Sequence, residues 1–320
     1  MEVSAMRILP LLIGAAALLA PMAVPALCAA AEPSPTVATF RLKVGEASIV
    51  ALSDGVFPLP ADQLLIADRP GVVEPLLQKA GLPAAPETTV NAFLIEVGGR
   101  RILVDTGSGA LLGPSLGGLA ASLKAAGYAP DQIDEILITH LHPDHVGGLT
   151  ADGGAVFPNA TVRVAKADAD YWLDKAHQAS ADASVKGAFD GAAASLAPYI
   201  AAGRFKPFEP GQALSPGLTA LSTPGHTPGH ASYRLVSKGQ TIVFWGDIVH
   251  VAAVQFPDPA VTIHFDTDPT QAAATRKALY EQAGGNHALV AASHIAFPGV
   301  GRVSQVGKTF IWSPVSNVGR

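Results

Sequence analysis

The chain has 320 residues, of which 49% are hydrophobic and 15% charged, and its mean hydropathy is +0.31. A positive mean raises the question of a membrane protein, but the apolar residues are concentrated in the first 31 positions. The longest apolar run there, residues 8–20, contains Pro10 and Gly14 and is shorter than the ~20 residues that cross a bilayer. The net charge of −5 and the lack of basic runs argue against a nucleic-acid partner.

Residues 1–31 are typical of a secretory signal peptide. Arg7 precedes the apolar run, and three alanines at positions 29–31 follow it as a cleavage site. A retained membrane anchor is the alternative, whereas a lipid anchor on Cys28 fits poorly because Leu27 is too large for the position before it. We therefore expect residues 32–320 to form a periplasmic or secreted protein with no membrane contact after the leader is removed.

The expected leader also contains all the sulfur of the chain. The only cysteine, Cys28, and the three methionines, Met1, Met6 and Met22, lie within it. The mature chain therefore has no disulfide, no thiolate metal ligand and no cysteine nucleophile. This composition suits an oxidising compartment, where both side chains are liabilities.

The first half of the mature chain is predicted to form mainly strands, with few helices. Residues 38–52 alternate in polarity and predict strands that end at a turn over 53–55. A loop-rich stretch follows to about residue 86, and the apolar runs 88–97 and 101–105, joined by two glycines, predict a hairpin. Residues 116–127 predict a helix, and residues 135–139 predict a short buried strand.

The second half alternates helices and strands. Residues 166–203 are rich in Ala, Asp and Lys and predict helices, while 218–222, 241–245 and 288–292 predict apolar strands that each end at a polar residue or turn. Residues 270–283 predict a helix between the last two strands. This alternation predicts an α/β fold, and the absence of a repeat favours one domain over 32–320 with a helical insert near 166–203.

Polar side chains that bind metals follow the ends of four predicted strands. Three histidines and an aspartate lie within six positions after the strand at 135–139, in a loop that can direct all of them into one space. In open α/β sheets, sites are assembled at this end of the strands. Imidazole and carboxylate at this density are typical ligands of zinc or a similar divalent metal. The residues are His140, His142, Asp144 and His145, followed by His226, Asp247 and His294.

These motifs resemble the metallo-β-lactamase superfamily. The order THLHPDHVGG, GHTPGH, an aspartate after an apolar strand and a final histidine is similar to that superfamily, and WGDIVHVAAVQFPDPAVTIHFDTDP resembles its methyl parathion hydrolase and lactonase group. The resemblance implies a four-layer αβ/βα sandwich with a dinuclear metal site at the sheet edge, and a homodimer by similarity to the group. It assigns His140, His142 and His226 to one metal, Asp144, His145 and His294 to the second, and Asp247 to both.

The chemistry of such a site is metal-dependent hydrolysis. Two divalent ions about 3.5–4 Å apart share a hydroxide that attacks a carbonyl or phosphoryl centre. We expect Zn²⁺, with Mn, Co or Fe as alternatives. The resemblance implies catalytic roles for Asp247, as the bridging carboxylate, and for Asp144. A bridging carboxylate favours a lactonase or phosphotriesterase over a true β-lactamase, which lacks it.

Several residues near the motifs are candidates for other roles. His250 is expected to line the pocket and donate a hydrogen bond to a substrate oxygen, and a structural histidine is the alternative. His230 is expected to orient the loop of His226, and Asp105 to support the ligand loop. No role in the site is expected for His177, His264 or His287.

An apolar pocket wall is expected from residues of the insert and the loops. Walls without a cationic side chain favour a small, neutral, hydrophobic substrate, although core packing is the alternative for each of the residues. The candidates are Leu111, Leu112, Trp172, Phe189, Phe256 and Ile263, together with His250.

The sequence thus predicts a hydrolase of lactones or hydrophobic esters, with phosphotriester hydrolysis as a side activity or as the alternative main activity. A non-catalytic periplasmic protein that binds a metal or ligand is the second alternative, but a structural zinc site needs only four closed ligands. Residues 113–117 match the G-x-S-x-G pattern of serine hydrolases, yet no predicted strand directly precedes Ser115 as that pattern requires.

Overall fold

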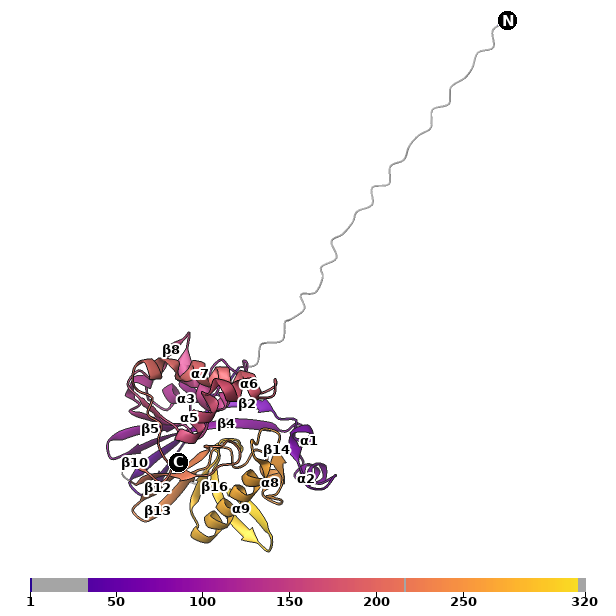
Figure 1. The fold of residues 1–320 in the computed structure, drawn as a ribbon. Coiled ribbons are helices and arrows are strands. Elements are labelled where there is room, and N and C mark those ends of the chain that lie inside the picture. Colours follow the sequence, from indigo (N-terminus) through magenta and orange to yellow (C-terminus); the bar gives the residue numbers. More distant parts are fainter. Residues whose placement is uncertain (2–33, 216, 316–320) are drawn as a thin grey trace. The chain divides into compact units, whose positions relative to one another are not determined.

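Two mixed β-sheets form the centre of the fold (Figure 1). The computed structural model describes residues 34–215 and 217–315, together with Met1. The predicted signal peptide and its cleavage site lie outside these described residues, Met1 apart. No helix within the described ranges combines the length and apolarity needed to cross a membrane.

The first sheet has six strands in the order β1-β2-β4-β5-β6-β9. β4 and β5 form the predicted hairpin, whereas β5, β6 and β9 run parallel to one another. The strands are β1 (Thr39–Val44), β2 (Ala47–Pro58), β4 (Glu87–Val97), β5 (Arg100–Val104), β6 (Glu135–Leu137) and β9 (Thr161–Arg163).

The second sheet has seven strands in the order β10-β11-β12-β13-β15-β16-β17. Only β13 and β15 pair in parallel among its described neighbours. The strands are β10 (Ala213–Ser215), β11 (Leu218–Ser222), β12 (Ala231–Ser237), β13 (Gln240–Phe244), β15 (Leu289–Ala291), β16 (Val300–Val306) and β17 (Thr309–Pro314). Two short pairs add β3 (Leu65–Ile66) with β14 (Thr262–Ile263), and β7 (Thr150–Ala151) with β8 (Gly154–Ala155).

Helices cover the outer faces of both sheets. The predicted insert consists of α5 (Lys166–Trp172), α6 (Lys175–Ser180) and α7 (Lys186–Ala201). The helix predicted over 270–283 is α9 (Pro269–Asn286), and the one predicted over 116–127 is the shorter α3 (Leu119–Ala125). The remaining elements are α1 (Ala61–Leu64), α2 (Val73–Lys79), η1 (Pro130–Gln132), α4 (Pro143–Val146), η2 (Gly147–Leu149) and α8 (Ala252–Gln255).

Strand alternation explains the layered core. In β2, Ile49 and Ala51 pack against the second sheet, whereas the intervening Val50 and Leu52 pack against α3, α5 and α7. Successive side chains of a strand point to opposite faces, so one strand contributes to both layers of the core. On the far side, Leu279 and Tyr280 of α9 cover the second sheet. The result is helix, sheet, sheet, helix, which confirms the predicted four-layer αβ/βα sandwich (Figure 1).

The turn predicted over residues 53–55 is wrong, because β2 continues through it to Pro58. The pairing of β2 with β4 shifts register between Ser53 and Gly55, which is a bulge within the strand. Asp54 is fully buried there, and its carboxylate accepts hydrogen bonds from the backbone N–H groups of Ser108, Gly117 and Leu119. The Asp54 carboxylate therefore holds the loop between β5 and α3 against the sheet.

Candidate metal centre

The candidate ligands meet at one edge of the sandwich because each follows the end of a strand. The loop after β6 and the start of α4 contribute four of them, and the loops after β11, β13 and β15 contribute one each. The parallel pairs β5–β6 and β13–β15 end at the same edge. All seven residues fall into two groups whose potential ligand atoms lie within 4.8 Å of one another. The groups are His140, His142, His226 and Asp247, and Asp144, His145, Asp247 and His294.

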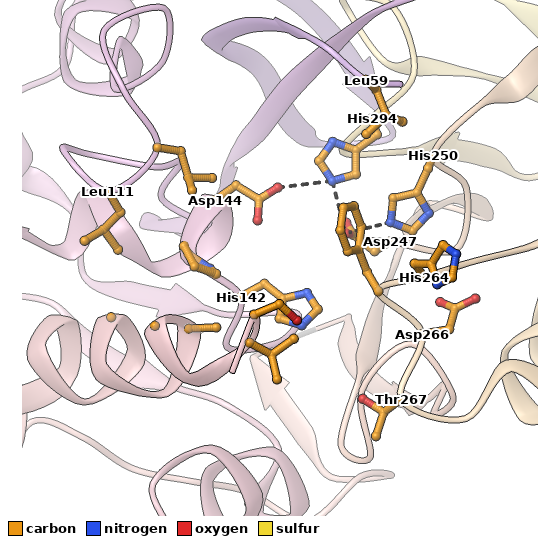
Figure 2. Close-up of a pocket in the computed structure, with 18 of the residues that line it drawn as sticks. Leu59, Leu111, His142, Asp144, Asp247, His250, His264, Asp266, Thr267 and His294 are labelled. Carbon is orange, nitrogen blue, oxygen red and sulfur yellow. Dashed lines mark hydrogen bonds and ion pairs between the residues drawn. The ribbon is translucent and has the colours of Figure 1, made fainter. Parts of the chain in front are cut away.

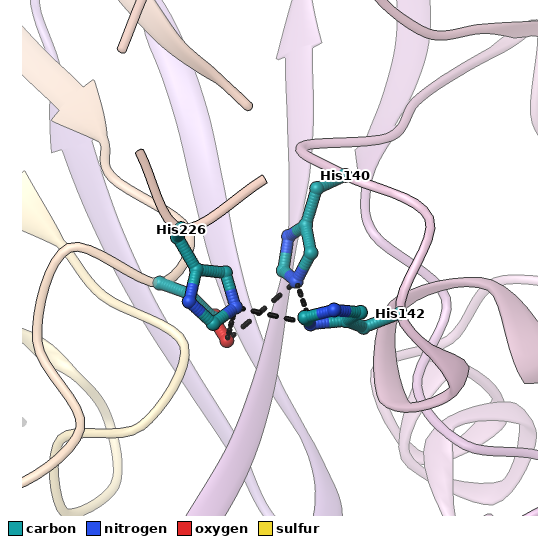
Figure 3. Close-up of side chains that lie close together, drawn as sticks. His140, His142 and His226 are labelled. Atoms are coloured by element: carbon teal, nitrogen blue, oxygen red, sulfur yellow. Dashed lines mark hydrogen bonds and ion pairs between the residues drawn. The ribbon is translucent and has the colours of Figure 1, made fainter. Parts of the chain in front are cut away.

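In the first group, three imidazoles point toward one another (Figure 3). His142 Nδ1 lies 2.9 Å from His140 Nε2 and 3.0 Å from His226 Nε2. The Asp247 carboxylate completes the group, with Oδ2 at 3.3 Å from His226 Nε2. Four donors around a tetrahedral zinc ion lie about 3.3 Å apart, so this spacing is close to that of a metal's coordination shell.

The second group shares Asp247 with the first. His294 Nε2 lies 3.0 Å from Asp247 Oδ2 and 3.3 Å from Asp144 Oδ2 (Figure 2). His145 Nε2 lies 3.1 Å from Asp247 Oδ1 and 3.4 Å from Asp144 Oδ2. Asp247 Oδ2 lies beside His226 of the first group and His294 of the second, and Oδ1 lies beside His145, so the carboxylate stands between the two groups.

The outer nitrogens of four histidines are held by oxygen atoms. Such contacts set the tautomer, so that the inner nitrogen is free to bind a metal. The pairs are His140 Nδ1 with Thr139 Oγ1 at 3.1 Å, His145 Nδ1 with Asp105 Oδ2 at 2.9 Å, His226 Nδ1 with Asp266 Oδ1 at 2.8 Å, and His294 Nδ1 with the Thr89 carbonyl at 2.9 Å.

Two aspartates outside the groups support the ligand loops. Asp105, expected to have this role, accepts hydrogen bonds from the N–H and hydroxyl of Thr139 besides contacting His145. Asp266 was missed by the sequence analysis. It contacts His226 from the loop after β14 and lies 3.8 Å from the buried guanidinium of Arg276. Only its adjacency to His264 within the family-like stretch 245–269 could have drawn attention to it.

Burial and mutual repulsion set the charges of the centre. Burial and the neighbouring His145 hold the pKa of His140 well below its ordinary value. Burial alone would raise the pKa of Asp247, but the imidazoles of His145 and His294 hold it well below its ordinary value. Burial opposes the charge on the other rings, but the carboxylate of Asp247 outweighs it and raises the pKa of His145 well above its ordinary value, that of His226 to about 9 and that of His294 to about 10. Metal ligands are neutral imidazoles and ionised carboxylates, so a bound metal would replace the protons on these three rings.

The donor atoms fit divalent metal ions. Within residues 34–215 and 217–315, His145 Nε2 and Asp247 Oδ1 are buried and have no hydrogen-bond partner, although they lie 3.1 Å apart. Such atoms are costly to bury unless something outside the protein binds them. The donor set of imidazole and carboxylate, shared through Asp247, fits two ions side by side.

Two further histidines border the centre. His230 does not act only on the loop of His226 as expected, because its Nε2 accepts the backbone N–H of Asp247 at 3.1 Å, while Nδ1 faces the Thr223 carbonyl at 3.1 Å. Burial lowers the pKa of His230 to about 3, which keeps it a neutral acceptor. His250 Nε2 lies 3.2 Å from Asp247 Oδ2, yet neither ring nitrogen has a hydrogen-bond partner among the described residues.

A cavity of about 740 Å³ opens directly onto the centre. Figure 2 shows Asp144, Asp247, His250 and His294 facing it, with Leu111 across from them. The predicted Leu111, Leu112, Trp172 and His250 all line it. None of its described lining residues is Lys or Arg.

Three predicted wall residues are core residues instead. Phe189 packs in the core between α7 and the first sheet, and Ile263 packs in the cluster beneath β3 and β14. Phe256 stacks between Tyr280 and Trp312, with ring centroids 4.8 and 5.6 Å away. None of the three lines the cavity. The prediction failed because the local sequence has no pattern that separates a cavity wall from a core.

The cavity has wall residues that the sequence analysis missed. His264 was expected to have no role, but it lines the mouth next to the exposed Phe265. Phe57 in β2, Leu59 just after it and Val185 before α7 also belong to the apolar wall. These segments are distant in sequence and are brought together only by the fold. Ser115 lies in the loop between β5 and α3, so the G-x-S-x-G match has no strand before its serine.

The sequence profile of the Metallo-beta-lactamase superfamily matches residues 85–294, which is more than half of the chain. The chain therefore belongs to the metallo-β-lactamase superfamily, and the predicted resemblance is confirmed. Membership, together with the two ligand groups, supports metal-dependent hydrolysis at a dinuclear site.

The chain is also similar to solved structures and to curated proteins. Hydrolase AbOPH of the beta-lactamase superfamily is 38% identical with a TM-score of 0.84, covering 88% of this chain and 98% of that one. AidC, a dizinc quorum-quenching lactonase solved with the product N-hexanoyl-L-homoserine, is 26% identical with a TM-score of 0.79, covering 88% and 99%. Ribonuclease TTHA0252 from Thermus thermophilus is 30% identical over 189 residues, and the chain spans only 39% of its length.

We expect the purified protein to contain two equivalents of divalent metal per chain, because two ligand groups share Asp247. His142→Ala leaves the first group incomplete and should reduce the content to about one equivalent. Elemental analysis after gel filtration measures this, with Leu112→Ala as the control that keeps both ions. Only trace metal in the unaltered protein would contradict the two-ion centre.

Phe256→Ala should lower the free energy of unfolding by about 3–5 kcal/mol, because the ring is 2% exposed and stacked in the core. The KM of the Phe256→Ala variant for a hydrophobic ester should stay unchanged. Leu112→Ala, at a site 47% exposed on the cavity rim, should change stability by less than about 0.5 kcal/mol but raise KM. Denaturant unfolding and steady-state kinetics measure both, and the reverse pattern would refute the assignment of wall and core.

Proposed function

We propose that this protein hydrolyses lactones or hydrophobic esters at a dinuclear zinc centre, and neutral phosphotriesters as a side activity. The observation that supports this most directly is the apolar cavity without Lys or Arg that opens onto the two ligand groups. Such a cavity favours a neutral acyl substrate over an anionic phosphate monoester or a nucleotide. The similarity to AidC, a dizinc lactonase, favours a lactone among the neutral substrates.

The ions, when bound, supply Lewis acidity and lower the pKa of water to near neutrality. The chain itself contributes charge and orientation. Asp247 is held ionised between the two groups, and the backbone N–H of Asp247 is fixed by His230. Because all seven candidate ligands converge on one small volume, the chain pre-organises the centre before substrate enters.

His250 is the candidate for contact with the substrate oxygen. Its ring is 4% exposed, lines the cavity and stacks on His294 with centroids 5.3 Å apart. Burial lowers its pKa to about 4, so the ring is neutral at pH 7 and has one N–H to donate. A neutral donor suits the carbonyl oxygen of an ester or lactone.

Apolar side chains form much of the cavity wall. Leu111 and Leu112, from the loop held by Asp54, line the cavity together with Trp172 of α5 and Phe265 of the loop after β14. These apolar side chains are placed to hold the acyl part of the substrate, which leaves the ester group at the centre.

On one Zn²⁺-loaded preparation, kcat/KM should be higher for an acyl lactone than for an aryl ester or a phosphotriester. Asp247→Ala should reduce activity about 100-fold or more, because it removes the shared carboxylate of both groups. Ser115→Ala is the matched control and should leave activity unchanged.

The other outcomes separate the alternatives. Preference for the phosphotriester would make phosphotriester hydrolysis the main activity. A large loss in Ser115→Ala with little loss in Asp247→Ala would favour a serine hydrolase. Hydrolysis that persists after a chelator has stripped the protein of metal would reject the metallohydrolase. Metal binding without any turnover would favour a non-catalytic binding protein.

We also propose that the mature protein is periplasmic or secreted. The support is the leader-like residues 1–31 and the absence of sulfur after them. N-terminal sequencing of protein from the periplasmic and culture fractions should find a start near residue 32. Protein retained in the membrane with residues 1–31 intact would contradict this.

A further inference from the structure

A buried carboxylate behind the centre has no part in the proposed chemistry. Asp168, at the start of α5, is fully buried. Its Oδ2 accepts the backbone N–H of Leu141 at 2.7 Å, and its Oδ1 accepts the backbone N–H of Gly229 at 3.0 Å. Hydrogen bonds from amides to a charged, buried acceptor are among the stronger ones in proteins.

The two amides belong to the two loops that hold the imidazoles of the first ligand group. Leu141 lies between His140 and His142 in the loop after β6. Gly229 lies three residues after His226 in the loop after β11. One carboxylate therefore joins two loops that are more than 80 residues apart in the sequence.

The joint between the loop of His226 and α5 is sterically tight. A Cβ atom added to Gly229 would lie 2.0 Å from the backbone nitrogen of Asp168 and 2.7 Å from its Cα. Only glycine allows the loop to approach the helix so closely. The position of the loop is thus determined by contact as well as by the hydrogen bond.

The second ligand group is supported differently. His145 is held by Asp105, and His294 by the carbonyl of Thr89. The two backbone hydrogen bonds that Asp168 accepts lie closest to ligands of the first group, since Leu141 stands between His140 and His142, whereas Asp144 and His145 follow in the first turn of α4. The support of the two groups is therefore asymmetric, although both share Asp247.

We propose that Asp168 is a positioning residue that sets the affinity of the metal ion held by His140, His142 and His226, with little effect on the other ion. The proposal rests on the dinuclear centre and is independent of which substrate is hydrolysed. In Asp168→Asn, an amide NH₂ replaces one carboxylate oxygen and faces a backbone N–H, so one loop loses its acceptor. The three imidazoles are then no longer held at the spacing that one ion requires.

The test measures metal affinity in two single-site backgrounds of the full mature chain. His294→Ala removes a ligand of the second group and leaves the first group complete. His142→Ala removes a ligand of the first group and leaves the second group complete. Co²⁺ is titrated in competition with a chromophoric chelator, with and without Asp168→Asn. The proposal expects Asp168→Asn to weaken Co²⁺ binding about 10-fold or more in the His294→Ala background and less than about 3-fold in the His142→Ala background.

A second variant approaches the same joint from the other side. Gly229→Ala keeps the carboxylate of Asp168 but displaces the loop of His226, so it should produce the same asymmetry. Asp105→Asn is the matched control, and it should weaken binding in the His142→Ala background, since Asp105 contacts His145 directly. Circular dichroism of the metal-free proteins reports on folding, and a general loss of stability would affect both backgrounds alike.

Equal weakening in both backgrounds, or no weakening in either, would overturn the proposal. If a background binds no Co²⁺, the two-step titration of Asp168→Asn in the otherwise unaltered chain decides, and weakening of both steps counts against the proposal. A protein that shows the asymmetry but hydrolyses neither lactone nor ester would refute the proposed function and leave the role of Asp168 intact.

Discussion

The buried carboxylate of Asp247 is the constraint on which the rest of the centre depends. Nitrogens of five imidazoles lie between 3.0 and 3.7 Å from its oxygens, and these come from His140, His145, His226, His250 and His294. A charge buried in this way is expensive unless it is paired. The protein concentrates this cost at one sheet edge, where divalent ions would offset it.

The surrounding structure holds the donors in place against that cost. The outer nitrogens of His145 and His226 face Asp105 and Asp266, and the amides of two loops face Asp168. These buried aspartates come from different parts of the chain, and each hydrogen-bonds to a ligand ring or to the backbone of a ligand loop. Contacts of this kind orient the ligands, and their loss lowers metal affinity by about 10- to 100-fold in other metalloproteins.

The candidate ligands could be predicted from sequence because they are local or follow strand ends. His140, His142 and His145 are close in the chain, and Asp247 directly follows an apolar strand. The hairpin of β4 and β5 could also be predicted from sequence, because Gly98 and Gly99 join two apolar runs. The turn expected at Asp54 was not, because a bulge inside a strand has the same composition as a turn.

The sequence by itself determined the fold class, the family and the identity of the candidate ligands, because strand periodicity and the histidine motifs are properties of short segments. Only the tertiary structure decided that Phe256 is core and Phe265 is cavity wall, because two nearby aromatic residues differ only in what distant elements pack against them. It also decided that Asp168 and Asp266 support the ligand loops. A carboxylate acts on whatever amide or imidazole the fold brings to it, and those partners lie 27 to 61 residues away along the chain.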